Sequence, residues 1–254
     1  MKLPRLFRRT AEDSAAVSYV PDGQRVYAIG DIHGRLDLLD HLLATIESDD
    51  ANRGFAETTL ILLGDLVDRG PQSRGVIERA MELARSARRV RFISGNHEEI
   101  FLRSIDGDRK AVALFASIGG LETMTSYGVA ADEFLQGDFG DLTALIRCKV
   151  PAEHRAFLAS FEDFIEIGDY LFVHAGIRPG TPIEQQRTSD MRWIRNEFLS
   201  YSGDHGTIVV HGHSIREEID ERPNRIGIDT GAYRTDKLTA LALEGNRRWF
   251  LSTG

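Results

Sequence analysis

Short apolar runs alternate with amphipathic segments over the first hundred residues. The run at 59–63, Thr-Leu-Ile-Leu-Leu, is nearly continuous, which is typical of a strand buried on both faces. Shorter runs of this kind predict further strands at 26–29, 90–94, 170–173 and 208–210. Between the first three runs, apolar residues recur every three or four positions, which predicts helices over 36–46 and 76–84. This alternation favours an α/β fold in which right-handed crossovers join parallel strands.

The pattern changes in the second half of the chain. Residues 100–167 contain helical segments separated by turn clusters, and we interpret them as a largely helical insertion that covers the site and shapes what enters it. Apolar runs then predict late strands at 226–228, 238–243 and 247–251, which we expect to build a second sheet. Residues 1–23 are predicted to be a basic, flexible tail, followed by one domain over 24–254.

Composition narrows the class of protein. A chain of 254 residues that is 42% hydrophobic fits one large domain, or one domain with an insertion. The net charge of −8 argues against binding nucleic acid through general positive charge. Cys148 is the only cysteine, so neither an intrachain disulfide nor a thiolate metal cluster can form. No stretch approaches 18 consecutive apolar residues, so we expect no membrane span. The single cysteine fits a reducing setting, so we expect a cytoplasmic protein.

Five polar motifs follow predicted strands. They are Gly-Asp-Ile-His-Gly at 30–34, Gly-Asp-Leu-Val-Asp-Arg-Gly at 64–70, Gly-Asn-His-Glu at 95–98, His-Ala-Gly at 174–176 and His-Gly-His at 211–213. In open α/β sheets, ligands bind beyond the carboxyl ends of the strands, so we expect the motifs to meet at one edge. Their glycines allow the backbone to turn sharply there. The joint pattern, rather than any single motif, indicates a functional site.

Together the motifs offer six candidate ligands for two adjacent divalent metal ions. Asp31 and His33 can share one ion, and Asp65 can bridge both. Asn96, His174 and His213 can complete the coordination of the second ion. A bridging carboxylate is expected because two divalent ions about 4 Å apart repel each other strongly. Oxygen and nitrogen ligands without thiolate favour Mn, with Fe or Zn as alternatives, and disfavour Ca.

The same motifs contain the groups needed to hydrolyse a phosphate ester. We expect a metal-bridging hydroxide to attack phosphorus in line. Arg69 can bind two phosphoryl oxygens at once. His97 is not needed as a ligand and can protonate the leaving alkoxide. Asp68 can hold the imidazole of His97 in the required tautomer and raise its pKa.

These motifs resemble the calcineurin-like metallophosphoesterases, in particular the bacterial and phage branch of the phosphoprotein phosphatase family. The resemblance covers about residues 25–251. It implies a four-layer α/β/β/α sandwich with a dimetal centre between two sheets, and it implies the same six metal ligands. It also implies that His97 is the proton donor, that Asp68 is its partner, and that Arg69 and Asn96 contact the phosphate. A second phosphate-binding arginine is implied in the segment Trp-Ile-Arg at 193–195, so Arg195 is chosen over Arg192.

The leading hypothesis is a phosphatase that acts on phosphoserine or phosphothreonine in proteins, with a phosphotyrosine preference as a variant. Symmetrical dinucleoside tetraphosphate hydrolases share most of the motifs but usually carry Ala at the position of Asp68, so Asp68 favours the protein phosphatases. The expected partner is a phosphoprotein or a small phosphorylated substrate, and no nucleic acid is expected. A scaffold without catalysis is disfavoured because no motif residue is missing. A nuclease is disfavoured because the chain lacks a basic, aromatic-rich stripe.

Three further residues lie in or near the motifs but outside the predicted ligand set, and the roles of His211 and Asp229 are open. His211 is a ligand, or it supports the ligands or contacts an anion. Asp229 either supports the site or belongs to a turn. Glu98 is expected to start and orient a helix rather than to bind metal.

Overall fold

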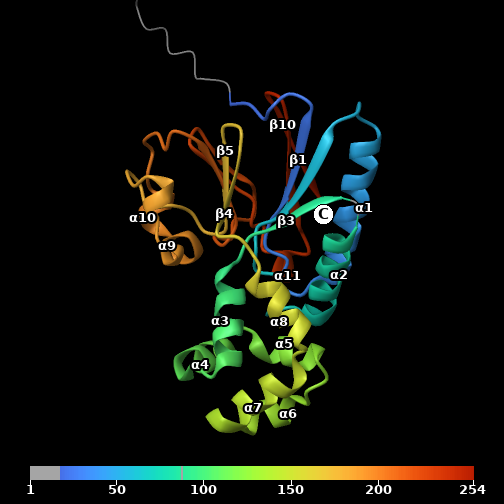
Figure 1. Ribbon diagram of the computed structural model, residues 1–254, viewed down its shortest axis with the longest axis vertical. Helices are drawn as coiled ribbons and strands as arrows, with labels where there is room; N and C mark the ends of the chain where they lie inside the picture. Colours follow the sequence, from blue (N-terminus) through green and yellow to red (C-terminus); the bar gives the residue numbers. More distant parts are fainter. Residues whose placement is uncertain (1–17, 87) are drawn as a thin grey trace, which may run out of the picture.

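The computed structural model describes residues 18–86 and 88–254 (Figure 1). Most of the predicted basic tail, residues 1–17, therefore lies outside the described residues. The described end of the predicted tail, residues 18–23, packs against the domain. Val20 is buried there, and its amide donates to the carbonyl of Gly245 at 2.9 Å. Ordered packing thus starts before residue 24, the boundary that the turn at 21–23 predicts.

The first sheet forms from both ends of the domain. Its strands are β1 (Gln24–Ile29), β2 (Glu57–Leu62), β3 (Arg89–Phe92), β9 (Thr239–Glu244) and β10 (Arg247–Ser252), in the order β10-β9-β1-β2-β3. As predicted, β1, β2 and β3 are parallel, while β9 and β10 are antiparallel to their neighbours. The connecting helices α1 (Leu36–Ala51) and α2 (Ser73–Arg85) cover one face of this sheet (Figure 1).

The second sheet faces the uncovered side of the first. Its order is β4-β5-β6-β8-β7, built from β4 (Phe164–Ile167), β5 (Tyr170–Val173), β6 (Ile208–His211), β7 (Asp220–Arg222) and β8 (Arg225–Gly227). Its outer face packs against α9 (Thr188–Trp193) and α10 (Asn196–Leu199), which follow the short 3₁₀ helix η1 (Ile183–Gln185). The layers are therefore helix, sheet, sheet, helix, and the predicted four-layer sandwich is confirmed.

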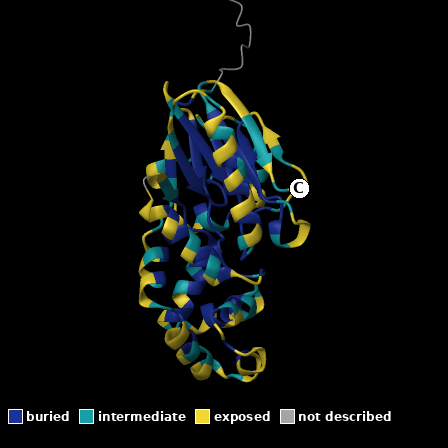
Figure 2. Ribbon diagram, turned by 90° about the vertical axis from the view of Figure 1, so that its right-hand side faces the viewer, coloured by how far each residue is buried: buried dark blue, intermediate teal, exposed yellow. Residues whose placement is uncertain are grey.

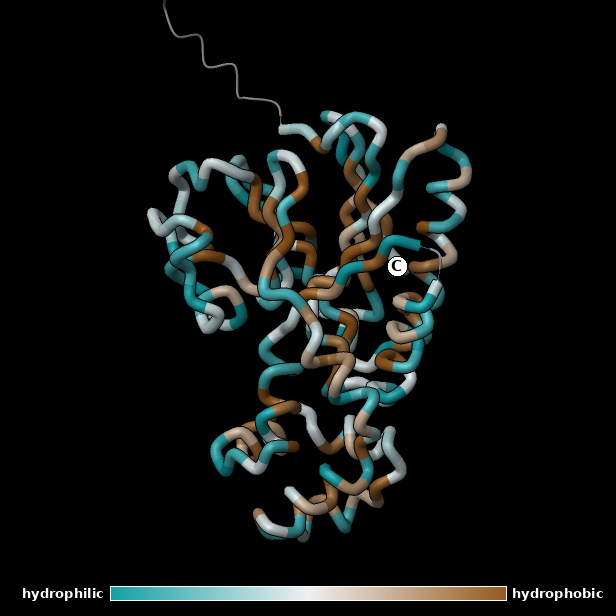
Figure 3. Tube along the Cα trace, viewed as in Figure 1, coloured by the Kyte–Doolittle hydropathy of each residue, from teal (hydrophilic) through white to brown (hydrophobic). Residues whose placement is uncertain are grey.

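Strand periodicity explains how the first sheet serves both neighbouring layers. Because successive side chains point to opposite faces, Tyr27 and Leu60 pack among the helices, while Val26 and Ile61 join the core between the sheets. The second sheet contributes Phe172 and similar residues to that inner core. Hydrophobic residues are concentrated in the strands of both sheets (Figure 3), and exposed residues lie mainly on the outer sides of the helices (Figure 2).

The late strands do not group as expected. Only β8 joins the second sheet, whereas β9 and β10 extend the first one. The reason is visible in the burial of β9, where Ala240 and Ala242 pack in the helix-covered core and Leu241 and Leu243 pack between the sheets. A strand that is apolar on both faces requires a central position, and β9 obtains one between β1 and β10.

The segment between β3 and β4 is helical, as predicted, over most of its length. Its helices are α3 (Asn96–Asp106), α4 (Arg109–Ser117), α5 (Gly120–Ser126), α6 (Ala131–Gln136), α7 (Phe139–Lys149) and α8 (Ala152–Ala159). They gather at one end of the two sheets (Figure 1). Residues 164–167, expected to belong to the insertion, form β4 instead, which pairs with β5.

A further short helix, α11 (Ala232–Thr235), lies between β8 and β9. Within the described ranges, no helix combines the length and the apolar content needed to cross a membrane.

Replacing Leu241 with Ala should lower the free energy of unfolding by about 2–5 kcal/mol, because this fully buried residue of β9 would leave a cavity between the sheets. Leu135→Ala is the matched control, since Leu135 is 69% exposed and should change stability by less than about 0.5 kcal/mol. Urea unfolding of both variants checks this. Equal losses would contradict the burial of Leu241 between the two sheets.

Candidate metal centre

The six predicted metal ligands lie just beyond the carboxyl ends of five strands. Asp31 and His33 follow β1, Asp65 follows β2, and Asn96 opens α3 after β3. His174 and His213 follow β5 and β6, so both sheets contribute. All six are buried, with exposed fractions of at most 5%. The tertiary structure therefore brings together residues that span more than 180 positions of the chain.

The backbone around these residues is unusual. Six described residues other than glycine have positive φ, and five of them belong to the predicted site, namely His33, Asp65, Asp68, Arg69 and His213. Their φ values lie between 45° and 71°. Side chains disfavour this left-handed region, and strained residues that persist in a fold cluster at functional sites. The strain therefore marks the same loops that the sequence motifs mark.

The motif glycines permit close approach to the carboxylates. A Cβ atom on Gly95 would lie 2.1 Å from Oδ1 of Asp65, and one on Gly212 would lie 2.0 Å from Oδ1 of Asp31. Any larger residue would have to displace a buried carboxylate. This explains why glycine precedes Asn96 and His213 in their motifs.

Backbone carbonyls set the tautomers of two imidazoles. Nδ1 of His33 donates to the carbonyl of Val67 at 2.8 Å, and Nδ1 of His174 donates to the carbonyl of Leu63 at 2.8 Å. In the neutral form of each ring, Nε2 is then unprotonated and available as a ligand atom, an arrangement typical of metal-binding histidines. Nε2 of His213 is buried and has no hydrogen-bond partner among the described residues. A buried acceptor of this kind is satisfied when a cation binds it.

Asp65 is shared by two groups of possible ligands. One group is His33, Asp65 and His97, and the other is Asp65, His174 and His213. Nε2 of His174 lies 3.4 Å from Oδ1 of Asp65, and Nε2 of His33 lies 3.6 Å from Oδ2. A carboxylate that turns one oxygen to each group suits a bridging position between two ions.

Asp31 belongs to neither group and lies beside His213 and His174 of the second one. Its carboxylate accepts from the amide of His213 at 3.0 Å, and its charge acts on His174. Asn96 reaches the second group, since its Oδ1 lies 3.0 Å from Nε2 of His174. The predicted ligands thus surround one site, with the imidazole of His97 as an additional neighbour.

The electrostatics of the centre call for added positive charge. Burial alone would raise the pKa of Asp65, but the imidazoles of His174 and His97 hold it well below its usual range. Burial lowers the pKa of His174, yet Asp65 and Asp31 raise it to about 10. Burial and the neighbouring His174 lower the pKa of His213 to about 2, so this ring is a neutral ligand. The donor set fits divalent metal ions, which would supply the positive charge that a proton on His174 supplies otherwise.

His97 and Asp68 form a buried pair at the edge of this centre. Nδ1 of His97 donates to Oδ2 of Asp68 at 2.6 Å, and both side chains are almost completely buried. Burial lowers the pKa of His97, but the charges of Asp65 and Asp68 raise it overall. The pair is thus arranged as a proton donor and its orienting carboxylate.

Arg69 reaches into the centre from the same loop as Asp68. Its two terminal nitrogens lie 2.9 Å from Nε2 of His33 and 3.1 Å from Nε2 of His97. Its guanidinium also lies over the ring of Tyr233, 4.8 Å from the ring centroid. An arginine in this position can bind an anion at the metal site.

The geometry supports the choice of Arg195 over Arg192. Arg192 is engaged by Asp163, at 2.6 Å, and lies 3.6 Å from Glu99. Arg195 precedes α10, has no ion pair within the described part of the chain, and its charge acts on His213. An exposed cation near a ligand is available to a substrate, and the role of Arg195 stays a prediction.

Glu98 has a role that sequence reasoning missed. Its Oε2 accepts from the amides of Asp65 and Gly95, and its Oε1 accepts from the amide of Leu66, at 2.8–2.9 Å. The spacing from Gly95 predicts the contact within its own helix. The contacts with the Asp65 loop depend on pairing between β2 and β3 and could not be read from the spacing. Glu98 thus holds together the two loops that carry Asp65 and Asn96.

The two other residues with open roles also lie near the centre. Asp229 is buried beside Asp31, and one of its oxygens has no partner within the described residues. His211 is buried against Phe198, its Nδ1 lies 3.0 Å from the carbonyl of Gly212, and it belongs to neither ligand group. His211 thus contacts the loop that carries His213, whereas the carboxylate of Asp229 accepts from the amide of Gly231 at 2.9 Å, as in a turn.

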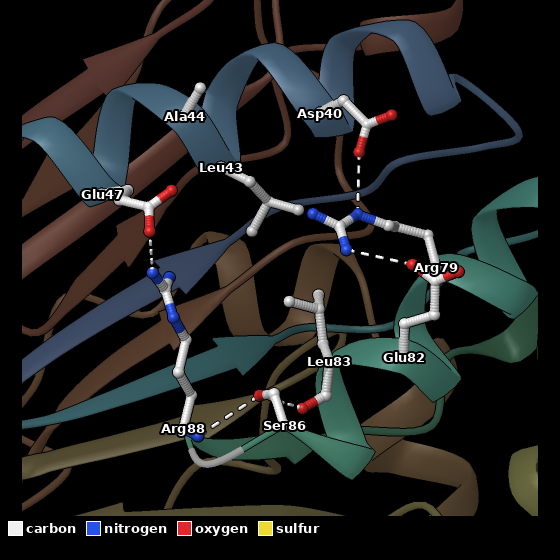
Figure 4. A pocket seen from close by; sticks show the side chains of 9 residues that line it. All are labelled: Asp40, Leu43, Ala44, Glu47, Arg79, Glu82, Leu83, Ser86 and Arg88. Carbon is white, nitrogen blue, oxygen red and sulfur yellow. Dashed lines mark hydrogen bonds and ion pairs between the residues drawn. The ribbon is translucent and has the colours of Figure 1, made fainter.

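A separate hollow of about 620 Å³ lies between α1 and α2 (Figure 4). Its charged side chains pair with one another, Arg79 with Asp40 and Glu82, and Arg88 with Glu47. None of the predicted site residues lines it. This hollow therefore lacks the buried ligand groups that the predicted metal centre offers.

Comparison with known proteins agrees with the geometry. The model of the calcineurin-like phosphoesterases matches residues 24–240. The chain belongs to this family. A symmetrical bis(5'-nucleosyl)-tetraphosphatase of Acidovorax ebreus (strain TPSY) is 30% identical over 70% of this phosphoesterase and 49% of the relative. The chain thus spans about half the length of that relative.

Two further matches cover most of both chains. The asymmetrical bis(5'-nucleosyl)-tetraphosphatase PrpE of Anoxybacillus flavithermus (strain DSM 21510 / WK1) is 29% identical over 84% of this chain and 88% of its own. A crystal structure assigned provisionally as a diadenosine tetraphosphatase superposes with a TM-score of 0.62 at 21% identity, covering 93% of this chain and 100% of the other. The structural match confirms the sandwich fold.

Divalent metal should stabilise this phosphoesterase through Asp65. At a free Mn²⁺ concentration of about 100 times the dissociation constant, binding should add about 2.7 kcal/mol to the free energy of unfolding. Asp65→Asn should lose most of this gain and most of the bound metal, because both ligand groups share the carboxylate. Thermal unfolding with elemental analysis of dialysed protein measures both quantities.

Asp132→Asn is the matched control, because Asp132 lies exposed in the first turn of α6. It should keep the full response to Mn²⁺. Retention of two ions per chain by Asp65→Asn would contradict the bridging position.

Proposed function

We propose that this phosphoesterase hydrolyses a phosphoanhydride bond of a dinucleoside tetraphosphate. The observation that carries the proposal is its similarity to bis(5'-nucleosyl)-tetraphosphatases, one of which matches over most of both chains. This reverses the preference for phosphoproteins that Asp68 suggests in the sequence. The coarser activity, metal-dependent hydrolysis of phosphate esters or anhydrides, follows from the family itself.

The charges at the candidate site suit a polyphosphate chain. A dinucleoside tetraphosphate carries a negative charge on each bridging phosphate, and arginine binds such groups through paired hydrogen bonds. Arg69 lies at the centre between His33 and His97, and Arg195 is exposed nearby. The whole chain has a net charge of −8, so attraction for the substrate is local to this site.

Each candidate residue has a role in this reaction. When bound, two divalent ions would polarise phosphoryl oxygens and acidify a water molecule. Arg69 and Arg195 would hold phosphoryl oxygens. Asn96 would bind metal and also contact the phosphate. His97 would donate a proton to the leaving oxygen while Asp68 keeps its imidazole in place through their 2.6 Å hydrogen bond.

The His97–Asp68 pair favours a second candidate function, dephosphorylation of phosphoserine or phosphothreonine. A phosphoanhydride expels a phosphate group, which is already a stable anion, whereas a phosphoserine ester expels an alkoxide that needs a proton. A buried histidine paired with a carboxylate is therefore of most use with phosphomonoesters. Phosphotyrosine, with a phenolate leaving group, lies between these two cases.

Product analysis should separate these functions. We expect diadenosine tetraphosphate to be hydrolysed by the Mn²⁺-loaded protein with a kcat/KM at least about ten times that for phosphoserine, phosphothreonine or phosphotyrosine peptides, since the relatives are tetraphosphatases. Chromatography of the nucleotides gives the bond that is cleaved. ADP alone indicates symmetrical cleavage, and ATP with AMP indicates asymmetrical cleavage.

Asp65→Asn, purified in parallel, controls for tetraphosphatase carried over from the expression host. Activity that survives in this variant belongs to a contaminant. Phosphate release from the phosphoserine or phosphothreonine peptides at the highest kcat/KM would overturn the proposal in favour of the second function.

A further inference from the structure

Helix α5 of the insertion contributes a side chain to the His97–Asp68 pair. Oγ1 of Thr123 donates to Oδ1 of Asp68 at 2.7 Å, while Oδ2 of the same carboxylate accepts from His97. The amide of Asp68 points to the hydroxyl oxygens of Thr123 and Ser73, at 2.9 and 3.0 Å. Thr123, Ser73 and Asp68 are all completely buried.

The protons of this cluster can be assigned from its chemistry. Each hydroxyl has one proton, and that of Thr123 goes to the carboxylate, so Ser73 is the donor across the 3.0 Å between the two hydroxyl oxygens. The single proton on the amide of Asp68 is then shared by both hydroxyls. Both carboxylate oxygens of Asp68 are satisfied, one by Thr123 and one by His97. With both oxygens held, the carboxylate cannot rotate away from the imidazole.

A second contact joins the same helix to the loop of Arg69. The amide of Arg69 donates to the carbonyl of Gly119, immediately before α5, at 3.2 Å. Gly119 has a φ of +115°, and a Cβ atom there would lie 2.4 Å from the nitrogen of Arg69. Asp68 and Arg69 are both left-handed, so this loop needs such external support.

We propose that Thr123 is a positioning residue for proton transfer by His97, and that the insertion is thereby part of the catalytic machinery rather than only a cover that selects substrates. The inference rests on the proton-donor role that the proposed function gives to His97, a role that matters most when the leaving group is an alkoxide. Thr123 acts through Asp68, and it has no contact with the predicted metal ligands among the described hydrogen bonds.

Loss of the Thr123 hydroxyl should affect leaving groups unequally. Without it, Oδ1 of Asp68 has no donor, and the carboxylate can turn so that His97 loses its orientation. A leaving alkoxide depends on the proton of His97, whereas nitrophenolate leaves without it. A purely structural role of Thr123 would reduce turnover of both substrates by the same factor.

The test compares Thr123→Val, Thr123→Ser and Thr143→Val in the Mn²⁺-loaded protein. Thr143 is the matched control, a buried threonine of α7 whose hydroxyl bonds only to the carbonyl of Phe139 within the described residues. We expect Thr123→Val to lower kcat for an alkyl phosphate about tenfold or more and kcat for 4-nitrophenyl phosphate less than about twofold. Thr123→Ser should restore both values, and Thr143→Val should leave both within about twofold.

A spectroscopic measurement on the protein loaded with Zn²⁺, which is diamagnetic, provides a readout that does not depend on turnover. The proton on Nδ1 of His97, in a 2.6 Å bond to a buried carboxylate, should give a downfield NMR resonance that His97→Asn removes. Thr123→Val should shift or broaden this resonance, while Thr123→Ser and Thr143→Val should not.

Each result decides the proposal. Equal losses on both substrates in Thr123→Val, an unchanged resonance, or absence of a leaving-group effect in His97→Asn would overturn it. These outcomes differ from failure of the proposed function, because that function is judged by the products of diadenosine tetraphosphate, whose leaving group needs little help from His97.

Discussion

The rest of the site depends on one buried carboxylate, that of Asp65. Two groups of imidazoles converge on it, one from the loops of the first sheet and one completed by the second sheet. Burying a carboxylate is costly unless positive charge and hydrogen bonds compensate for the loss of water. The amide of His97 donates to Oδ1 of Asp65, and the imidazoles lower its pKa. The two sheets must therefore meet in a fixed register at this point.

The surrounding loops are held by hydrogen bonds as well as by the buried side chains of Ile32, Leu66 and Val67. The carboxylate of Glu98 accepts hydrogen bonds from three backbone amides of two neighbouring loops. The hydroxyl groups of Thr123 and Ser73 form hydrogen bonds with Asp68. These contacts support backbone conformations that side chains disfavour on their own. Hydrogen bonds of this kind would hold the predicted ligands in place before metal or substrate binds, as in a preorganised site.

Substrate choice has a separate basis from metal binding. The predicted metal ligands belong to the sandwich and suit any phosphoryl group. The side chains around them differ in the kind of substrate whose reaction they would assist. In the proposed roles, Arg69 would favour charge-rich substrates, and the His97–Asp68 pair would favour poor leaving groups. The similarity to tetraphosphatases and the presence of this pair therefore support different substrates on one scaffold. Asp68 alone was too narrow a basis for choosing between them.

The sequence by itself determined the α/β class, the parallel direction of the first three strands and the polar motifs, because periodicity and glycine-flanked turns are local properties of the chain. It could not decide that β9 joins the first sheet, since an apolar strand fits the core of either one. Nor could it reveal the contacts of Glu98 and Thr123 with the site, which cross 32 and 55 positions. Only the packing of helices and strands brought those partners together, because side-chain hydrogen bonds at such separations depend on tertiary position and leave no periodic signal.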